Sequence, residues 1–410
     1  MRGLLTVLVT LAIGPAVSAG ENGKSESVTP VLAPDAKVTA ILAGLGEGAS
    51  ADLPPIKTTG DINEVARKYR METRGPCGRN YCIKMMWMPE RKRAIFCGAN
   101  HGVPHRLNDV WEYDLASNTW VCLYGPDLSK GTRMTGWSDT SVVNGVLRTK
   151  RGGPAIIGHA WWQLDYDPER KAMLFLSSWT MFPKEVKAKM FPQNKHRPPL
   201  WAFYPEKKKW EPIMPKGKTP RTGIAVYFQY IPTLKRSAYV DAGWRAGGMW
   251  LYNSADNSWE KKHGGEKFKA KNNPGTPGGD GVMVYAPDRN ILIGCTRNGK
   301  GSPGGRTVHY DVAKAEWQPA ASGAETPKGH DSFTPCGYDT VAKAMFLYDQ
   351  QAKVFWGYDP GDKKWSKITP KGPPPPPGRG KVIGYYDEAR NVFVLNQASK
   401  VWVYRHKRGG

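Results

Sequence analysis

The chain has few acidic residues, few cysteines and no long apolar run beyond its N-terminal segment. Its 59 lysines and arginines outnumber 36 aspartates and glutamates, which gives a formal net charge of +23. This excess permits binding to acidic polymers such as polysaccharide, cell wall, anionic lipid or nucleic acid, but a basic solvated surface explains it equally well. Because no later window approaches membrane-spanning length, the mature chain is predicted to have no transmembrane segment.

The six cysteines form no CxxC pair and no CxxCH haem site, and the chain has no HExxH motif. Zinc-finger, haem c and zincin functions therefore have no support, and neither a metal nor another cofactor is expected. Cys77 and Cys82, in CGRNYC, are close enough for a disulfide that closes a small loop. The spacing of the remaining cysteines indicates no pairing: Cys97, Cys122, Cys295 and Cys336.

Residues 1–19 have the layout of a secretory signal peptide: Arg2, an apolar stretch, and small residues up to Ala19. A membrane anchor is the alternative, but the stretch is short for a span and contains Gly14 and Pro15. We therefore predict a secreted or periplasmic protein. The chain has no Asn-x-Ser/Thr sequon, which favours a bacterial source. An exported protein meets glycans more often than DNA, so nucleic acid is not an expected partner.

A first motif occurs six times along the chain. It reads as an aromatic residue, a turn with Asp or Pro and a basic residue, and then an apolar run. Its copies cover residues 86–98, 165–177, 229–241, 284–295, 337–349 and 385–396. The apolar runs are short, alternate with period two and are bounded by Pro, Gly, Asn and Asp, so each copy predicts a β-hairpin and not a helix.

A second motif follows each hairpin and reads as a strand that ends in tyrosine, a polar turn and a tryptophan. Its tyrosines are Tyr113, Tyr204, Tyr252, Tyr310, Tyr358 and Tyr404, and the tryptophans that follow the first five are Trp120, Trp210, Trp259, Trp317 and Trp365. The motif adds a third and a fourth strand to each hairpin. Four strands at a period of roughly 50 residues make one blade of a β-propeller, whose packing needs large flat side chains between blades.

These hairpins and Tyr…Trp pairs, over about residues 71–410, resemble the kelch-repeat family and the galactose-oxidase central-domain superfamily. The resemblance implies an all-β fold, a six-bladed kelch-like β-propeller. It also raises the copper chemistry of galactose oxidase. That enzyme needs two tyrosines, two histidines and a cysteine joined to a tyrosine, a set with no matching positions here, and its propeller has seven blades.

The sixth copy lacks its tryptophan-bearing outer strand. An open ring leaves unpaired strand edges, so we predict that residues 52–60, DLPPIKTTG, supply the missing strand. The predicted organisation is a signal peptide (1–19), a flexible tail with at most one short helix (20–50), a closing strand and lead-in (51–70), and the propeller (71–410). Asp61 and Glu64, in capping-box spacing, predict a helical turn before the first blade.

In kelch-like propellers the site lies at one mouth of the channel, where innermost strands begin and second strands end. Here those positions are polar, aromatic and rich in arginine, which suits a funnel for an anionic or sugar ligand. The candidate ligand-binding residues are Arg79, His159, Arg245, Asp280, Arg297, His330, Asp331 and Arg379. Alternatively, such residues satisfy backbone groups or channel water. Inserts at residues 127–157 and 181–199 enlarge this side or its neighbours.

The sequence favours an exported, monomeric binding scaffold for acidic or neutral polysaccharide or for an envelope protein, more a binding protein than an enzyme. The alternative is a carbohydrate-active enzyme, an epimerase, mutarotase or lyase of acidic sugars. In that enzyme Arg245, Arg297 and Arg379 would hold a carboxylate, and His159 or His330 would move a proton. A metal-dependent oxidase ranks third. No reaction motif is present, so no catalytic residue is assigned.

Overall fold

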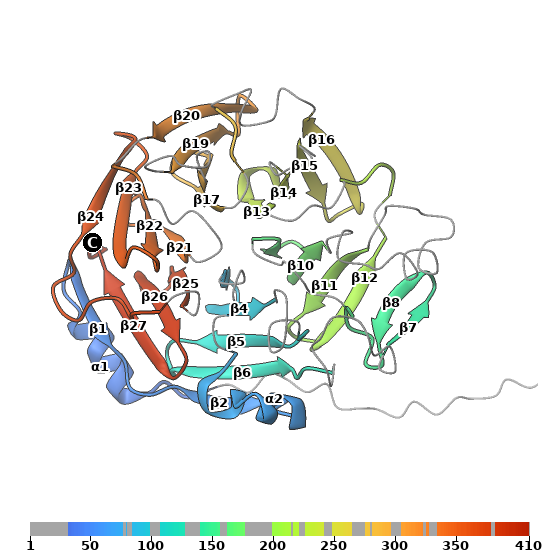
Figure 1. Cartoon of the computed structure of the whole chain (residues 1–410), viewed down its shortest axis with the longest axis horizontal. Coiled ribbons are helices and arrows are strands. Elements are labelled where there is room, and N and C mark those ends of the chain that lie inside the picture. The colour runs from blue at the N-terminus through green and yellow to red at the C-terminus, as the bar shows by residue number, and fades with distance from the viewer. Residues whose placement is uncertain are drawn as a thin grey trace, which may run out of the picture.

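A computed structural model gives the arrangement of the chain, which forms a ring of six β-sheets around a central channel (Figure 1). The structure describes residues 32–76, 79, 84–98, 107–127, 140–155, 162–176, 199–214, 216–220, 226–241, 248–264, 275–278, 281–296, 305–322, 325–327, 334–378 and 382–409. The all-β, six-bladed propeller predicted from the repeats is confirmed. Within the described residues, no helix combines the length and apolar character needed to cross a lipid bilayer.

Each blade is an antiparallel meander whose first strand faces the channel and whose fourth strand lies at the rim. Blades one to three contain, from inside to outside, β3 (Met86–Met88), β4 (Arg93–Cys97), β5 (Val110–Asp114) and β6 (Thr119–Tyr124); β9 (Leu164–Asp167), β10 (Ala172–Leu176), β11 (Leu200–Tyr204) and β12 (Lys209–Ile213); and β13 (Tyr227–Ile231), β14 (Arg236–Asp241), β15 (Gly248–Asn253) and β16 (Ser258–His263). Blades four to six contain β17 (Gly281–Ala286), β18 (Ile291–Thr296), β19 (Arg306–Asp311) and β20 (Glu316–Ser322); β21 (Cys336–Asp339), β22 (Ala344–Asp349), β23 (Val354–Asp359) and β24 (Lys364–Ile368); and β25 (Ile383–Asp387), β26 (Val392–Gln397), β27 (Lys400–Arg405) and β1 (Ala49–Asp52).

The turns between first and second strands form because their residues accept a left-handed backbone. The last turn residue has φ between 50° and 55° in all six blades: Lys92, Lys171, Lys235, Asn290, Lys343 and Asn391. In blade two the Asp167 carboxylate also accepts hydrogen bonds from the backbone N–H groups of Glu169 and Arg170, at 2.9 and 3.1 Å. A left-handed residue after a tight turn and an aspartate that caps it are local features, so the hairpins could be predicted from sequence.

The Tyr…Trp motif places two aromatic rings opposite each other on strands three and four. Tyr113 lies opposite Trp120 with ring centroids 5.0 Å apart, and the same pairing recurs in blades three, four and five. Blade two differs, since its spacing is six residues instead of seven. There Phe203 lies opposite Trp210, 5.2 Å away, and Tyr204 lies opposite Lys209.

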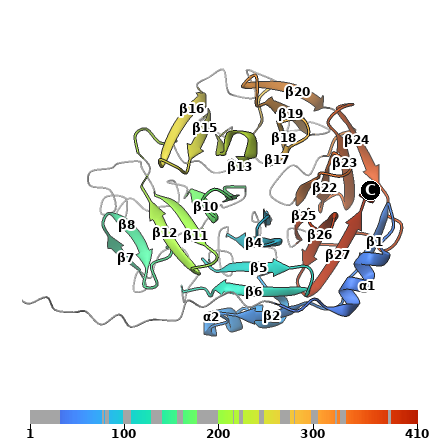
Figure 2. The same ribbon diagram turned by 180° about the vertical axis from the view of Figure 1, so that it is seen from behind.

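The N-terminal region closes the ring, but with two strands instead of one. Strand β1 pairs with β27 and completes blade six, while β2 (Lys57–Gly60) pairs in parallel with β6 and gives blade one a fifth strand (Figure 2). Closure by an N-terminal strand is thus confirmed, whereas the single strand predicted over residues 52–60 is split. Pro54 and Pro55 separate the two strands because proline has no N–H to donate to a ladder.

Short helices lie outside the ring beside these strands. Helix α1 (Ala36–Gly44), capped by Asp35, lies in the segment predicted as a tail and buries Val38 and Leu42. Helix α2 (Glu64–Lys68) occupies the predicted helical turn, but its cap is Asn63. Asp61 instead accepts hydrogen bonds from the Gly125 N–H and the Arg151 guanidinium. A third helix, α3 (Met71–Arg74), leads into blade one.

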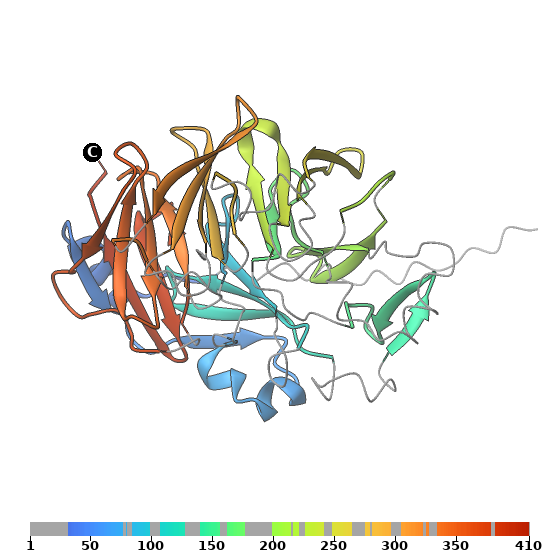
Figure 3. The same ribbon diagram turned by 45° about the horizontal axis from the view of Figure 1, so that its top comes forward.

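The insert between blades one and two carries a separate β-ribbon. Strands β7 (Thr140–Val143) and β8 (Val146–Thr149) join through Asn144 and Gly145 and project beyond the ring (Figure 3). Both turn residues have positive φ, as a two-residue hairpin turn requires. The ribbon exposes Val142 and Val143.

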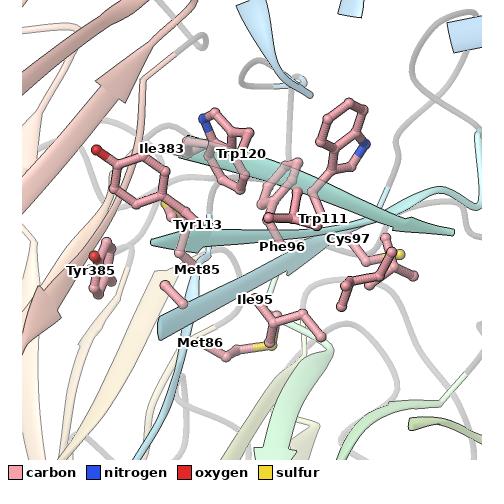
Figure 4. Close-up of a cluster of buried hydrophobic side chains, with 14 of the residues drawn as sticks. Met85, Met86, Ile95, Phe96, Cys97, Trp111, Tyr113, Trp120, Ile383 and Tyr385 are labelled. Atoms are coloured by element: carbon pink, nitrogen blue, oxygen red, sulfur yellow. The ribbon is translucent and has the colours of Figure 1, made fainter. Parts of the chain in front are cut away.

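The junction of blades six and one is sealed by aromatic side chains. In Figure 4, Tyr385 of blade six lies beside the Tyr113 and Trp120 pair of blade one. The Tyr385 ring meets Tyr113 edge-on at 6.4 Å and stacks on Trp87 at 6.1 Å. This junction is held by packing across the sheets as well as by the closing strands.

Candidate functional site

A cavity of about 530 Å³ lies in the central channel, within the size range of small-molecule sites. Its described lining comes from the innermost strands of all six blades and from the turns that follow them. It begins at Lys84 and Trp162, next to the starts of inner strands, and reaches the turn prolines Pro89, Pro168 and Pro232. Each blade therefore contributes equivalent positions to one concave surface.

One of these equivalent positions is aromatic in every blade. It lies two residues before the turn, near the end of the inner strand, and all six side chains line the cavity: Trp87, Tyr166, Tyr230, Tyr285, Tyr338 and Tyr386. We call this set the inner aromatic ring. Its members are the aromatic residues that open the first repeated motif, which sequence analysis interpreted only as part of a hairpin.

Each tyrosine of the inner aromatic ring bonds to a polar group of the preceding blade. The Tyr230 hydroxyl donates to Glu169 at 3.0 Å, and the Tyr386 hydroxyl donates to Asp339 at 3.0 Å. The remaining tyrosines follow the same rule. Tyr166 donates to Glu90, Tyr338 donates to Asp288, and the Tyr285 and Thr233 hydroxyls lie 3.4 Å apart. The Trp87 side chain of blade one lies near Glu388 of blade six and lowers its pKa. Polar contacts therefore connect neighbouring blades around the ring.

Burial favours the hydroxyl form of Tyr166, Tyr230 and Tyr338. Desolvation, and then the carboxylate that each one faces, raises the pKa of Tyr166, Tyr230 and Tyr338. A phenol next to a carboxylate and partly removed from water does not ionise near neutral pH. The ring therefore presents fixed hydroxyl donors to the turn carboxylates and leaves its aromatic faces beside the cavity.

At the other end of the lining, a buried ion pair connects three blades. The Lys84 Nζ lies 2.9 Å from an Asp165 carboxylate oxygen and 2.7 Å from the Phe228 carbonyl oxygen, in blades one, two and three. The other carboxylate oxygen of Asp165 accepts the backbone N–H of Tyr230. Burial raises the pKa of Asp165 although Lys84 opposes the shift. Lys84 also lies 5.2 Å from the centroid of the Trp162 ring.

The position just before the inner aromatic ring differs from blade to blade. All six of these side chains or backbones line the cavity: Met86, Asp165, Gln229, Val284, Gly337 and Tyr385. In blade five only glycine fits, because a Cβ at Gly337 would lie 2.8 Å from the Tyr386 backbone nitrogen and Cβ. The lining at this position is thus apolar or aromatic at Met86, Val284 and Tyr385, whereas Asp165 and Gln229 supply a charge and an amide.

The charged groups of the described lining are one cation and three carboxylates: Lys84, Asp165, Glu169 and Glu388. Glu388 is exposed to solvent, although protein atoms lie around its carboxyl group. Partial desolvation by these atoms raises its pKa, and the negative charge of Asp387 raises it further. Cys336 also lines the cavity, and burial raises the pKa of its thiol well above the usual value, so it stays protonated. In the part of the chain that the structure describes, no three His, Cys, Asp or Glu side chains are placed to hold a metal.

Among the residues predicted from sequence, only Arg79 is described. It is buried, and its guanidinium forms an ion pair with Asp109 and donates to the Gly98 carbonyl at 2.9 Å. The other candidates lie outside the described residues: His159, Arg245, Asp280, Arg297, His330, Asp331 and Arg379. Cys77 and Cys82 lie outside them too. The four cysteines left without a predicted pairing are buried and form no disulfide: Cys97, Cys122, Cys295 and Cys336.

Sequence analysis missed the cavity residues for an identifiable reason. It searched the starts of inner strands and the ends of second strands, whereas the cavity also uses the ends of the inner strands and their turns. A signal was present, since aligning the six hairpins brings the ring aromatics to one column and Asp165 and Gln229 to the column before it. Lys84, which precedes the first hairpin, carries no such signal.

No protein-family model matches the chain, and no curated protein matches it. Solved structures that resemble it include TolB from Acinetobacter baumannii, with 10% identity and a TM-score of 0.40 over 71% of this chain and 55% of TolB. A gluconolactonase from Xanthomonas campestris has 9% identity and a TM-score of 0.44, over 86% of this chain and 97% of that one. An auxiliary nutrient binding protein from Bacteroides ovatus has 9% identity and a TM-score of 0.47, over 87% and 76%.

Proposed function

We propose that the protein is an exported, kelch-like propeller that binds a small carbohydrate in its central cavity. The observation that carries the proposal is the inner aromatic ring, which lines a cavity of about 530 Å³ together with Gln229, Glu169 and Glu388. Aromatic faces cover the C–H surface of a sugar, while carboxylate and amide groups bond to its hydroxyls. Rigid inner strands hold both kinds of group.

The charges of the described lining favour a neutral over an acidic sugar. Asp165 neutralises Lys84, and the two remaining carboxylates would repel a uronic or sialic acid. Binding of acidic polysaccharide elsewhere on the basic surface, or of an envelope protein, stays a prediction. So does the enzyme alternative, because its histidines and arginines lie outside the described residues.

Calorimetric titration of the protein with neutral mono- and oligosaccharides tests the proposal. We expect saturable binding, and a loss of affinity of about two- to tenfold in Trp87→Ala, which is what one lost aromatic contact of about 0.5–1.5 kcal/mol gives. The matched control is Trp317→Ala, which removes a half-buried tryptophan from the rim strand β20. An absence of binding at millimolar sugar, or an equal loss in both variants, would refute the proposal.

A further inference from the structure

Resting on the proposed function, the geometry points to a sugar that carries a positive charge, the ammonium group of an amino sugar. We infer that this group binds at the junction of blades six and one, against Trp87 and the carboxylate of Glu388. The inference names the substrate class of the same cavity. It stands on three features of that cavity: its charge balance, the accessibility of Glu388, and the aromatic side chain that touches it.

In the described lining, two carboxylates, Glu169 and Glu388, have no buried cation as a partner. Lys84 and Asp165 form a closed pair, 2.9 Å apart and almost fully buried. Among the described residues, the cation that lies near Glu169 is Lys235, at 4.0 Å, and that lysine side chain is 73% exposed. Such a contact is largely screened by water. Within the described lining, carboxylates therefore outnumber cations, although the chain as a whole has a net charge of +23.

Glu388 is the better placed of the two carboxylates. Among the described residues, no lysine or arginine forms an ion pair with it, and its neighbour Asp387, which is itself paired with Arg390, raises its pKa. Its side chain is open to solvent, so a ligand reaches it without any movement of the protein. Asp387, in the same turn, is not accessible in this way, because its carboxylate is buried and forms an ion pair with Arg390 at 3.1 Å.

Trp87 supplies the second half of the subsite. It lines the cavity together with Glu388, lowers the pKa of that carboxyl group and is only partly buried. Tryptophan is the aromatic side chain that attracts cations most strongly, and a carboxylate at its edge strengthens the same preference. Tyr385, stacked on Trp87 at 6.1 Å, extends the aromatic surface. An ammonium group here gains both an ion pair and a cation–π contact, which a neutral hydroxyl of the same sugar does not.

The test compares four probes by calorimetry on the full protein: glucosamine, glucose, N-acetylglucosamine and choline. We expect glucosamine to bind about tenfold more tightly than the other two sugars. In Glu388→Gln the ratio of the glucosamine to the glucose affinity falls to near one. Glu316→Gln, which removes the same charge from the exposed edge of β20, leaves that ratio unchanged. Thermal melting of both variants checks that they fold.

The outcomes separate this inference from the proposed function. Equal binding of all three sugars overturns the inference and leaves a neutral-sugar site. Binding of choline without binding of any sugar would support the cation subsite and refute the proposal that the ligand is a sugar. If no probe binds, both fail. A glucosamine preference that persists in Glu388→Gln overturns the assignment to this carboxylate.

Discussion

The blades carry two sets of aromatic residues, one at the rim side and one beside the channel, and the two sets work differently. The outer pairs on strands three and four contact each other at 4.8–5.2 Å within one blade, as with Tyr358 and Trp365. The inner aromatic ring makes its polar contacts with the preceding blade and faces the cavity. Members of both sets link neighbouring blades, as the Tyr358 hydroxyl does with His309, whereas the inner set also lines the cavity.

This difference shows how a repeated sequence can encode both a fold and a site. Positions that stay constant between repeats, such as the outer tryptophan, do the same packing task in each blade. The position before the inner aromatic varies, from Asp165 to Gln229 to Val284, and it is there that the cavity becomes asymmetric. A ligand-binding surface needs that asymmetry, because identical residues from six blades would give a symmetric channel.

The largest loss of stability is expected when a buried tryptophan of the outer set is removed. Trp120→Ala removes a side chain that is 1% exposed and packs on Tyr113 and Phe96. The free energy of unfolding should fall by about 3–5 kcal/mol, as for other buried aromatic residues replaced by alanine. Urea unfolding measures it. Trp317→Ala, at the equivalent but half-buried position of blade four, should cost clearly less; equal costs would show that burial does not set the effect.

The second-largest loss of stability is expected when the buried ion pair of Lys84 and Asp165 is disrupted. Lys84→Met leaves Asp165 without its cation and should lower the free energy of unfolding by about 3 kcal/mol at pH 7. The double variant Lys84→Met/Asp165→Asn should regain most of this, since the amide still accepts the Tyr230 N–H without a charge. A double variant as unstable as the single one would mean that Lys84 acts through packing and not through its charge.

A pH dependence is expected from a buried histidine that lies next to the outer aromatic pair of blade four. His309, in β19, bonds through Nε2 to the Tyr358 hydroxyl at 2.9 Å, and burial, followed by Lys363 and Arg289, lowers its pKa to about 4. The unfolded chain then binds more protons than the folded one between pH 4 and the usual histidine value of about 6.5. Stability should therefore be complete above that value and decrease by about 3 kcal/mol as pH falls through the window. Urea melts of His309→Gln should lack this slope.

The smallest effect is expected for one bond of the inner aromatic ring. Tyr166→Phe removes the hydroxyl that donates to Glu90 and should cost about 1 kcal/mol of unfolding free energy, with no change in sugar affinity. Chemical unfolding and calorimetry on the same sample measure both. A loss of affinity as large as that in Trp87→Ala would show that the bonds of the ring, and not only its faces, hold the ligand.

The fold could be predicted because its signals are local and repeated. Strand, turn and Tyr…Trp spacing recur along the chain, and the missing strand of the last blade points to a donor elsewhere. The split at Pro54 and Pro55 could also have been predicted, because proline has no backbone N–H to donate to a neighbouring strand. Blade two shows the limit of spacing: one residue fewer moves the aromatic contact from Tyr204 to Phe203.

The site was less predictable because its partners come from different blades. Lys84 and Asp165 are 81 positions apart, and Tyr230 meets Glu169 only after two sheets have packed. No pattern within one repeat specifies which blade-to-blade pairs form, since that depends on the angle between sheets and on closure of the ring. The prediction of a basic funnel from Arg245, Arg297 and Arg379 concerns residues outside those described, and it stays a prediction.

Closure by β1 also bears on how the molecule is made. The guanidinium of Arg405 donates to the carbonyl of Leu42, a residue 363 positions earlier, and the partners in β1 and β27 are 350 to 356 positions apart. During synthesis the segment that completes blade six emerges first and finds its partner last. Five blades can assemble in order as they appear, but the sixth must wait for both ends, so folding is slow at its final step by virtue of chain topology alone.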